Sequence, residues 1–230
     1  MPPPADPDEA ARRLATDALA TADPTGWFER LYAAASDGEA VVPWDRGGPN
    51  PFLAEWTATR DLADVGRALV VGCGLGGDAE LIAGLGPATV AFDVAPTAVA
   101  TARSRHPGSR VEYVTADLLD PPTEWTQAYD LVIESLTVQS LPLTVRQAAI
   151  ANVAAFVRPG GRLLVIAFGG IDDDTHEGPP WPLSRDDIES FASEGLSVVR
   201  LEDIADPAAG VHRWRVEFLR PYEVLPGKSN

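Results

Sequence analysis

Four glycines stand between an apolar run and a stretch of helical spacing. The segment at 70–78, VVGCGLGGD, contains Gly72, Gly74, Gly76 and Gly77. Glycine has no Cβ, so a ligand can approach the backbone there and meet the free amides of the following helix. About twenty residues later a second apolar run ends in Asp93, whose carboxylate can accept hydrogen bonds from both hydroxyls of a ribose. These two features predict a site for an adenosine-type ligand.

The glycine spacing alone fits two classes of ligand. Gly72-x-Gly74-x-x-Gly77 fits a dinucleotide turn, whereas Gly72-x-Gly74-x-Gly76 followed by Asp78 fits a turn for S-adenosylmethionine. A pyrophosphate is anionic and favours a helix N-terminus without a carboxylate, while Asp78 suits a ligand that carries an ammonium and a sulfonium. The residues therefore favour S-adenosylmethionine and leave a NAD(P)-dependent oxidoreductase as an alternative.

Two further carboxylates stand where parallel strands are expected to end. Asp117 follows one expected strand and Glu134 ends another, and the segment 135–141 then crosses the same edge. Ligands of open α/β sheets bind at the carboxyl edge of the strands, so Asp117 can hydrogen-bond an adenine while Leu118 packs against it. We assign Asp78 or Glu134 to the amino acid end of the ligand.

Apolar runs alternate with stretches of helical spacing through most of the chain. We expect helices at 78–83, 96–105 and 143–157, and strands at 68–71, 89–92, 110–114, 129–135 and 162–168. This alternation predicts a Rossmann-like α/β fold with helices on both faces of a mostly parallel sheet. Near the end of the chain, apolar and charged residues alternate over 213–218, which predicts a half-exposed antiparallel strand.

The segment ahead of this alternation has a different character. Two amphipathic helices are expected within it, followed by a loop rich in proline and glycine, and it carries Tyr32, Trp44 and Arg46. Exposed aromatic side chains need a concave surface to cover, and the ligand edge of the sheet provides one. We therefore predict a tail and helical cover at 1–48 over a single compact domain at 49–230.

Composition limits the partners and the compartment. The chain has 230 residues and a formal net charge of -16, which opposes binding to nucleic acid or to an anionic membrane surface. We find no targeting segment or membrane span and expect a cytoplasmic protein. The single cysteine, Cys73, excludes an intramolecular disulfide and a cysteine-based metal site, and we predict no metal. The oligomeric state is not predicted.

Taken together, these motifs resemble those of the class I S-adenosylmethionine-dependent methyltransferases over roughly residues 40–220. The matching pieces are VVGCGLG at 70–76, Asp93, ADLL at 116–119, YDLVIE at 129–134 and RPGGRL at 158–163. The resemblance implies a seven-stranded sheet whose last strand is antiparallel, and S-adenosylmethionine as the cofactor. The cofactor-binding residues that we expect are Gly72, Cys73, Gly74, Gly76, Asp78, Asp93, Val94, Asp117, Leu118, Glu134 and Trp44.

Within that class, the segments VPWDRGGP at 42–49 and GPPWPL at 178–183 look like the branch of thiopurine and thiol methyltransferases and related enzymes for small molecules. This resemblance implies that Trp44 lies near the cofactor. An aromatic face there can hold a sulfonium without a formal negative charge. We expect Tyr32, Arg46 and Trp181 to contact a small-molecule acceptor.

Methyl transfer to such an acceptor is a direct displacement, so the predicted mechanism depends mainly on alignment of nucleophile, methyl group and sulfur. A carboxylate beside the methyl group would stabilise the ground state, and the acids should therefore lie away from it. No catalytic residue is identified; His176 is a candidate general base for a phenol or an alcohol, while a thiolate or an amine needs none. A non-catalytic protein of the same fold that binds an adenosyl ligand is a further alternative.

Overall fold

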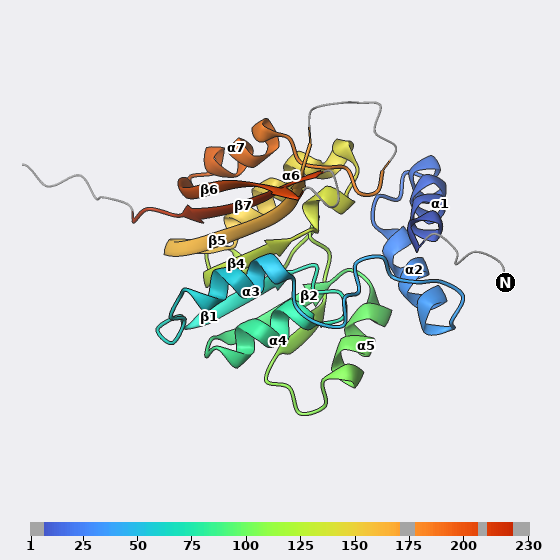
Figure 1. The fold of residues 1–230 in the computed structure, drawn as a ribbon, viewed down its shortest axis with the longest axis horizontal. Coiled ribbons are helices and arrows are strands. Elements are labelled where there is room, and N and C mark those ends of the chain that lie inside the picture. Colours follow the sequence, from blue (N-terminus) through green and yellow to red (C-terminus); the bar gives the residue numbers. More distant parts are fainter. Residues whose placement is uncertain (1–6, 171–177, 207–210, 223–230) are drawn as a thin grey trace, which may run out of the picture.

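The computed structural model describes residues 7–170, 178–206 and 211–222 (Figure 1). Its centre is a seven-stranded sheet in the order β3-β2-β1-β4-β5-β7-β6. The strands are β1 (Arg67–Val71), β2 (Ala88–Asp93), β3 (Glu112–Thr115), β4 (Tyr129–Ser135), β5 (Val157–Gly169), β6 (Ser197–Asp206) and β7 (Val211–Leu219). Strands β1 to β5 are parallel, whereas β7 runs antiparallel to both β5 and β6. The predicted Rossmann-like sheet and its antiparallel last strand are confirmed.

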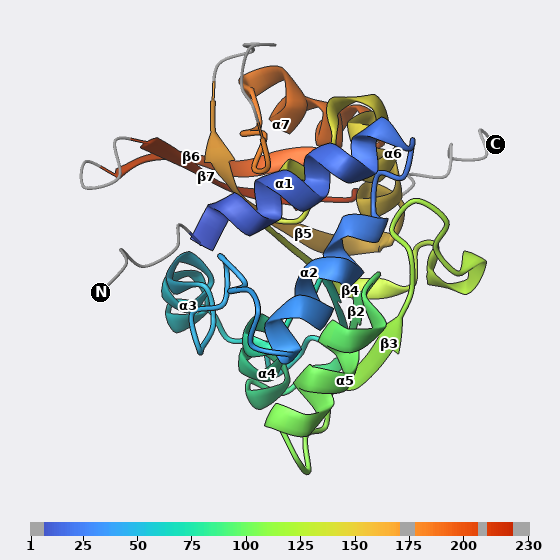
Figure 2. The same ribbon diagram turned by 90° about the vertical axis from the view of Figure 1, so that its right-hand side faces the viewer.

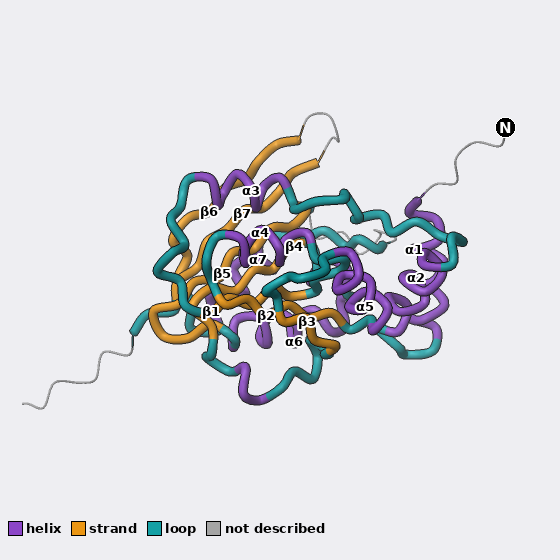
Figure 3. The backbone as a smooth tube through the Cα atoms, turned by 90° about the horizontal axis from the view of Figure 1, so that it is seen from below, coloured by secondary structure: helices purple, strands orange, loops and turns teal. Residues whose placement is uncertain are grey.

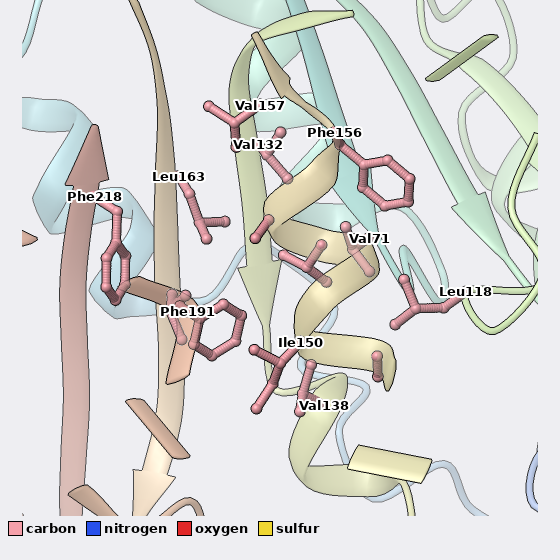
Figure 4. Packing of buried hydrophobic residues seen from close by; sticks show 14 of the residues in the cluster. Val71, Leu118, Val132, Val138, Ile150, Phe156, Val157, Leu163, Phe191 and Phe218 are labelled. Carbon is pink, nitrogen blue, oxygen red and sulfur yellow. The ribbon is translucent and has the colours of Figure 1, made fainter. Parts of the chain in front are cut away.

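Helices cover both faces of the sheet. On one face α3 (Pro51–Ala58), α4 (Gly77–Gly84) and α5 (Pro96–Arg105) pack on β1, β2 and β4 through residues such as Leu53, Ile82 and Val99. On the other face lie α6 (Leu143–Ala155) and α7 (Arg185–Ser193), together with the 3-10 turns η1 (Thr123–Trp125) and η2 (Val138–Ser140). Ile150 and Phe191 belong to the apolar cluster on that face, which Figure 4 shows between helix and sheet.

The helix before β5 ends earlier than the sequence indicates. We expected Val157 on the buried face of a helix with Leu143, but α6 ends at Ala155 and Val157 pairs with Tyr129 in the sheet. Leu143 is 49% exposed. The glycines after Pro159 extend the strand rather than ending a helix, because Gly160 donates its amide hydrogen to Arg220 O at 2.8 Å. The helical spacing therefore continues by coincidence into the start of a strand.

The charged side of β7 is buried, so the expectation of a half-exposed strand is wrong. Arg213 and Arg215 are each 8% exposed and Glu217 is 5% exposed. Strand β7 lies between β5 and β6, and Arg215 Nε donates to Glu202 Oε2 of β6 at 2.7 Å. Helix α3 covers the charged side of β7, where Trp56 Nε1 donates to Glu217 Oε2 at 3.3 Å. Ion pairs and hydrogen bonds thus take the place of solvent on this side of the strand.

Two helices precede α3 and the sheet. They are α1 (Pro7–Ala20) and α2 (Gly26–Ser36), and Figures 2 and 3 show them beyond the end of the strand layer rather than on either face. Glu29 of α2 anchors this pair to the domain, since its carboxylate accepts hydrogen bonds from Thr97 N at 3.0 Å and Thr97 Oγ1 at 2.6 Å at the start of α5. Among the described helices, none is long and apolar enough to cross a membrane.

Candidate functional site

The glycine turn between β1 and α4 brings the backbone close to other elements. Gly72 has φ +58° and a Cβ there would lie 2.3 Å from Thr137 Oγ1. Gly74 has φ +50°, and its Cβ would lie 2.9 Å from the hydroxyl of Tyr32. A side chain at either position would require a left-handed backbone conformation and a collision. The turn is therefore open only because both residues are glycine.

A cavity lies between this turn, the carboxyl ends of the strands and the N-terminal segment. Of the residues predicted for the cofactor or the acceptor, eleven line it: Tyr32, Trp44, Arg46, Gly72, Cys73, Gly74, Asp78, Asp93, Val94, Asp117 and Leu118. The segment after β4 also lines it, through Ser135, Leu136, Thr137, Ser140 and Leu141. The structure thus brings together residues that are separated by more than a hundred positions in the sequence.

Three predicted site residues do not line this cavity. Gly76 is the N-cap of α4 and faces Tyr113. Trp181 is held elsewhere, with its amide donating to Gln139 O at 2.7 Å. Glu134 is fully buried, and its Oε1 accepts hydrogen bonds from Thr137 N at 2.8 Å and Val138 N at 2.9 Å. His176, the candidate base, lies outside the described residues.

Glu134, which we expected as one of two candidates for the amino acid end of the ligand, lies beneath the cavity surface and does not line it. A carboxylate at a strand end can point to either face of the sheet, and this one turns inward, where it orders the turn that leads into η2. Burial raises the pKa of Glu134 to about 7. The residues next to it, Ser135 to Thr137, reach the cavity instead.

Backbone amides fix the two acids nearest the glycine turn. Asp93 is 6% exposed and accepts hydrogen bonds from Gly74 N and Ala95 N, each at 2.9 Å. Burial raises its pKa to about 6, against the opposing effect of these amides. Asp78 accepts a hydrogen bond from Asn50 N at 2.6 Å, and burial raises its pKa as well. Both carboxylates are therefore oriented before any ligand arrives.

Three aromatic side chains from the N-terminal segment form one side of the cavity, and we call Phe28, Tyr32 and Trp44 the aromatic wall. Trp44 Nε1 donates to the Tyr32 hydroxyl at 2.8 Å. The Trp44 ring centroid lies 6.2 Å from that of Phe28 and 6.1 Å from that of Tyr32, in edge contacts. Burial, and then the nearby Asp93, raise the pKa of Tyr32 well above its ordinary value, so this phenol stays protonated.

The sequence predicted only part of the aromatic wall. Phe28 was expected among the aromatic side chains of the cover, but no ligand contact was assigned to it, because its apolar spacing with Leu31 is equally typical of a helix core. Trp44 was expected near the cofactor only through a resemblance. The contact that joins it to Tyr32 depends on how the loop returns to α2, and an ion pair of 3.0 Å between Asp45 and Arg105 of α5 helps to hold that loop.

The observed groups fit an adenosyl ligand. Buried Asp93 lies at the end of β2, the glycine turn leaves its backbone open, and the aromatic wall lies beside this turn at Gly74 and lines the same cavity. Together with the seven-stranded sheet and its antiparallel β7, these features define a class I methyltransferase.

Comparisons with known proteins agree with this class. Residues 68–161 match the family of the methyltransferase domain. The chain is similar to a ubiquinone biosynthesis O-methyltransferase of Xanthomonas euvesicatoria pv. vesicatoria, with 33% identity over 197 residues, covering 81% of this chain and 73% of that protein. It is also similar to a probable thiol methyltransferase 2 of Arabidopsis thaliana, with 27% identity over 206 residues, covering 82% and 89% of the two chains.

A solved structure concerned with the conversion of a disulfide bond into a thioacetal group during echinomycin biosynthesis shares the fold, with a TM-score of 0.67 and 25% identity. The alignment covers 85% of this chain and 92% of that one. The chain therefore belongs to the S-adenosylmethionine-dependent methyltransferases, and it is an enzyme that uses this methyl donor. The oxidoreductase and the non-catalytic binding protein are no longer needed as alternatives.

Proposed function

We propose that the cavity holds S-adenosylmethionine and a small thiol side by side, and that the enzyme methylates the sulfur of this thiol. In this proposal Asp93 accepts hydrogen bonds from the ribose, Asp117 and Leu118 contact the adenine, and Asp78 contacts the amino acid end. The support is positional, because all four side chains line one cavity above the glycine turn. The cofactor supplies an electrophilic methyl group on a sulfonium.

The aromatic wall is the observation that carries the choice of acceptor. Its two polar atoms bind each other, since Trp44 Nε1 donates to the Tyr32 hydroxyl. Tyr32 also has a raised pKa, so its phenol is a poor base at neutral pH. The wall can orient an acceptor and exclude water, but it does not remove a proton. An acceptor that loses its proton to solvent suits this wall best.

Thiols ionise by themselves more readily than alcohols or phenols, with an ordinary pKa of about 8.5 for a cysteine-like thiol. The thiolate sulfur forms its bond to the methyl carbon as the bond from that carbon to the sulfonium breaks. The electron pair of the broken bond stays on the departing sulfur, and the thiol proton has already gone to solvent. Alignment of this kind can contribute about 7 to 11 kcal/mol to a reaction barrier. The thiol methyltransferase similar to this chain supports the same acceptor class.

Two further parts of the proposal follow from this chemistry. The helices and loop at 7–48 act as a cover over the domain that follows, because Phe28, Tyr32 and Trp44 line the cavity from that segment. The enzyme works in the cytoplasm, where thiols are kept reduced. A net charge of -16 opposes nucleic acid as an acceptor.

An acceptor panel tests the proposal. Thiols, phenols and primary amines of matched size are incubated with the enzyme and S-adenosylmethionine, and products are measured by mass spectrometry from pH 6 to pH 9. We expect methylated thiols, with a rate that rises as the thiol ionises. Methylation of phenols or amines in preference to thiols would contradict the proposed acceptor, and a rate independent of thiol ionisation would contradict the proposed mechanism.

A further inference from the structure

A short loop separates the cofactor cavity from solvent. Its five residues are all exposed, and all but the last also line the cavity: Asp45, Arg46, Gly47, Gly48 and Pro49. The flanking residues are better packed, since Trp44 is partly buried and Asn50 is buried. A segment that lines a cavity and is exposed at the same time forms a thin wall rather than a packed layer. We call residues 45–49 the mouth loop.

Hydrogen bonds fix the chain at both ends of the mouth loop. Before the loop, Trp44 Nε1 donates to the Tyr32 hydroxyl of α2 at 2.8 Å. After the loop, Asn50 N donates to Asp78 Oδ1 of α4 at 2.6 Å. The side chain of Asn50 also donates to Ser135 Oγ at the end of β4, at 3.1 Å. The loop therefore crosses the cavity from the N-terminal helices to the edge of the sheet.

Between these ends, an ion pair holds the loop on α5. Asp45 Oδ2 lies 3.0 Å from a guanidinium nitrogen of Arg105, the last residue of that helix, and both side chains line the cavity. The hydrogen bond from Arg105 lowers the pKa of Asp45, so the pair is charged at neutral pH. The two side chains are 26% and 43% exposed. Ion pairs with this much solvent around them are weak, so this one can break and form again.

The glycines of the loop allow it to move and also bring it onto the glycine turn. Gly47 has φ +68°, and nothing lies within 4 Å of the place where its Cβ would be, so its backbone can rotate without a collision. A Cβ at Gly77 would lie 2.5 Å from Gly48 O. The loop thus lies directly on the start of α4, and a cofactor cannot pass between the two unless the loop moves.

We propose that the mouth loop opens to exchange S-adenosylhomocysteine for S-adenosylmethionine, and that the ion pair between Asp45 and Arg105 controls the rate of this opening. The inference rests on the proposed function in placing the cofactor in this cavity, but it does not depend on the acceptor. The ion pair joins two protein side chains, so it holds the loop over the free and the occupied cavity alike. Breaking it therefore speeds entry and exit together and leaves the dissociation constant nearly unchanged.

The rates of binding test this inference. S-adenosylhomocysteine is mixed with the protein at a series of concentrations, and tryptophan fluorescence in a stopped-flow instrument gives the association and dissociation rate constants. We expect Asp45→Asn and Arg105→Gln each to raise both constants by roughly two- to fivefold, the range that an exposed ion pair can account for. Asparagine at position 45 can still accept the hydrogen bond that Gly47 N donates at 3.0 Å, so this variant removes the charge and keeps the turn.

Salt and a double variant show whether the two residues act as a pair. Added salt should raise both rate constants in the unsubstituted protein, because it screens the ion pair, and should have little effect in either variant. The double variant Asp45→Asn, Arg105→Gln should be no faster than either single variant, because each single change already breaks the same contact. The control is Arg185→Gln on α7, which breaks an exposed ion pair of 2.7 Å with Glu189 outside the cavity and should leave both constants unchanged.

The outcomes separate this inference from its alternatives. Unchanged rate constants in both single variants, or effects that add fully in the double variant, overturn it. A weaker affinity with an unchanged association rate would mean that Asp45 or Arg105 contacts the ligand instead, and the inference would be wrong. The measurement contains no acceptor, so it is independent of the proposed reaction: if no thiol is methylated but the rates change as expected, the proposed acceptor fails and the role of the ion pair stands.

Discussion

Asp93 combines two tasks in one carboxylate. Its oxygens each accept one backbone amide hydrogen, and its place in the cavity leaves it in reach of a ligand. We expect Asp93→Ala to weaken binding of S-adenosylhomocysteine by on the order of 1 to 3 kcal/mol, because charge-assisted hydrogen bonds to the ribose are lost. Calorimetric titration measures this change.

The exposed Asp64→Ala is the control for the Asp93 variant, and it should bind the ligand unchanged. Asp93→Ala should also lower the melting temperature, because Gly74 N and Ala95 N lose their acceptor. An unchanged affinity in a folded Asp93→Ala protein would place the ribose elsewhere.

Glu134 gives a prediction about pH. Its pKa rises from 4.5 to about 7 in the folded protein because the side chain is buried. The folded state then binds the proton more tightly than the unfolded state, so this residue's contribution to stability falls as pH rises from about 4.5 to 7. Glu134→Gln removes the charge and keeps an oxygen that can accept from Thr137 N and Val138 N.

The Glu134→Gln variant should therefore gain stability relative to the unsubstituted protein as pH increases, by on the order of 1 to 3 kcal/mol between pH 5 and pH 8. Urea unfolding at both pH values measures the difference. A stability difference that is the same at pH 5 and pH 8 would show that Glu134 does not titrate in this range.

Local sequence signals identified the residues whose role is set by the backbone around them. The glycines at 72 and 74 are required by the turn itself, and Asp93 ends a strand that leads to the same edge. Glu134 also ends a strand, but its side chain turns into the protein. No local signal separates these two outcomes, because they depend on which elements cover each face of the sheet.

At the scale of elements, the start of α7 shows how a short motif fixes a helix. Ser184 accepts a hydrogen bond from Asp187 N at 3.1 Å, and Asp187 Oδ2 accepts one from Ser184 N at 3.0 Å. Asp187 also pairs with buried Arg146 of α6 at 2.7 Å. We expect Ser184→Ala to cost about 0.5 to 2 kcal/mol of stability in urea unfolding.

Ser184→Thr should preserve most of that stability, since threonine also caps helices. Neither variant should change the affinity for S-adenosylhomocysteine by more than about twofold. Helix α7 lies on the same face of the sheet as α6 and contributes no residue to the cofactor cavity. A large loss of affinity in Ser184→Ala would mean that this face of the sheet is coupled to the site.

Strand β7 marks the limit of what an alternating pattern can predict. The alternation of Trp214, Val216 and Phe218 with charged residues correctly indicated an antiparallel strand. It did not reveal that α3 covers the charged side, because Glu55 and Trp56 of α3 lie 160 and 161 residues away in the sequence from their partners Arg215 and Glu217. The predicted end of the helix before β5 was also wrong, because Val157 continues the helical spacing of apolar residues by chance although it begins the strand.

At the scale of the whole molecule, the family motifs predicted the fold and the edge of the sheet where the cofactor is expected to bind. The role of the N-terminal segment as a cover is a separate prediction that has to be tested. Its aromatic wall is packed on Trp27, which stacks on Phe28 with ring centroids 4.0 Å apart. The wall therefore extends from the interior of the α1–α2 pair to the cavity. A ligand that contacts the wall should stabilise the entire segment.

We expect the amides of residues about 24 to 48 to exchange hydrogen more slowly when S-adenosylhomocysteine is bound, because opening of the cover would break contacts with the ligand. Hydrogen exchange followed by mass spectrometry measures this. Peptides from α7, which contributes no residue to the cofactor cavity, serve as the internal control and should exchange at an unchanged rate. Equal exchange in 24–48 with and without ligand would mean that this segment is ordinary packing.

A substitution of Trp44 tests whether the proposed cover contributes to turnover. Trp44→Ala should reduce kcat/KM by more than about tenfold while lowering stability less than a core tryptophan would, because a cover positions the acceptor and excludes water. Trp44 is only partly buried, unlike Trp27 at 1% exposure. Trp44→Phe keeps an aromatic ring but loses the hydrogen bond to Tyr32, so it should fall between the two proteins. A fully active Trp44→Ala enzyme would place the acceptor away from the wall, whereas loss of activity only in proportion to unfolding would leave Trp44 with a packing role alone.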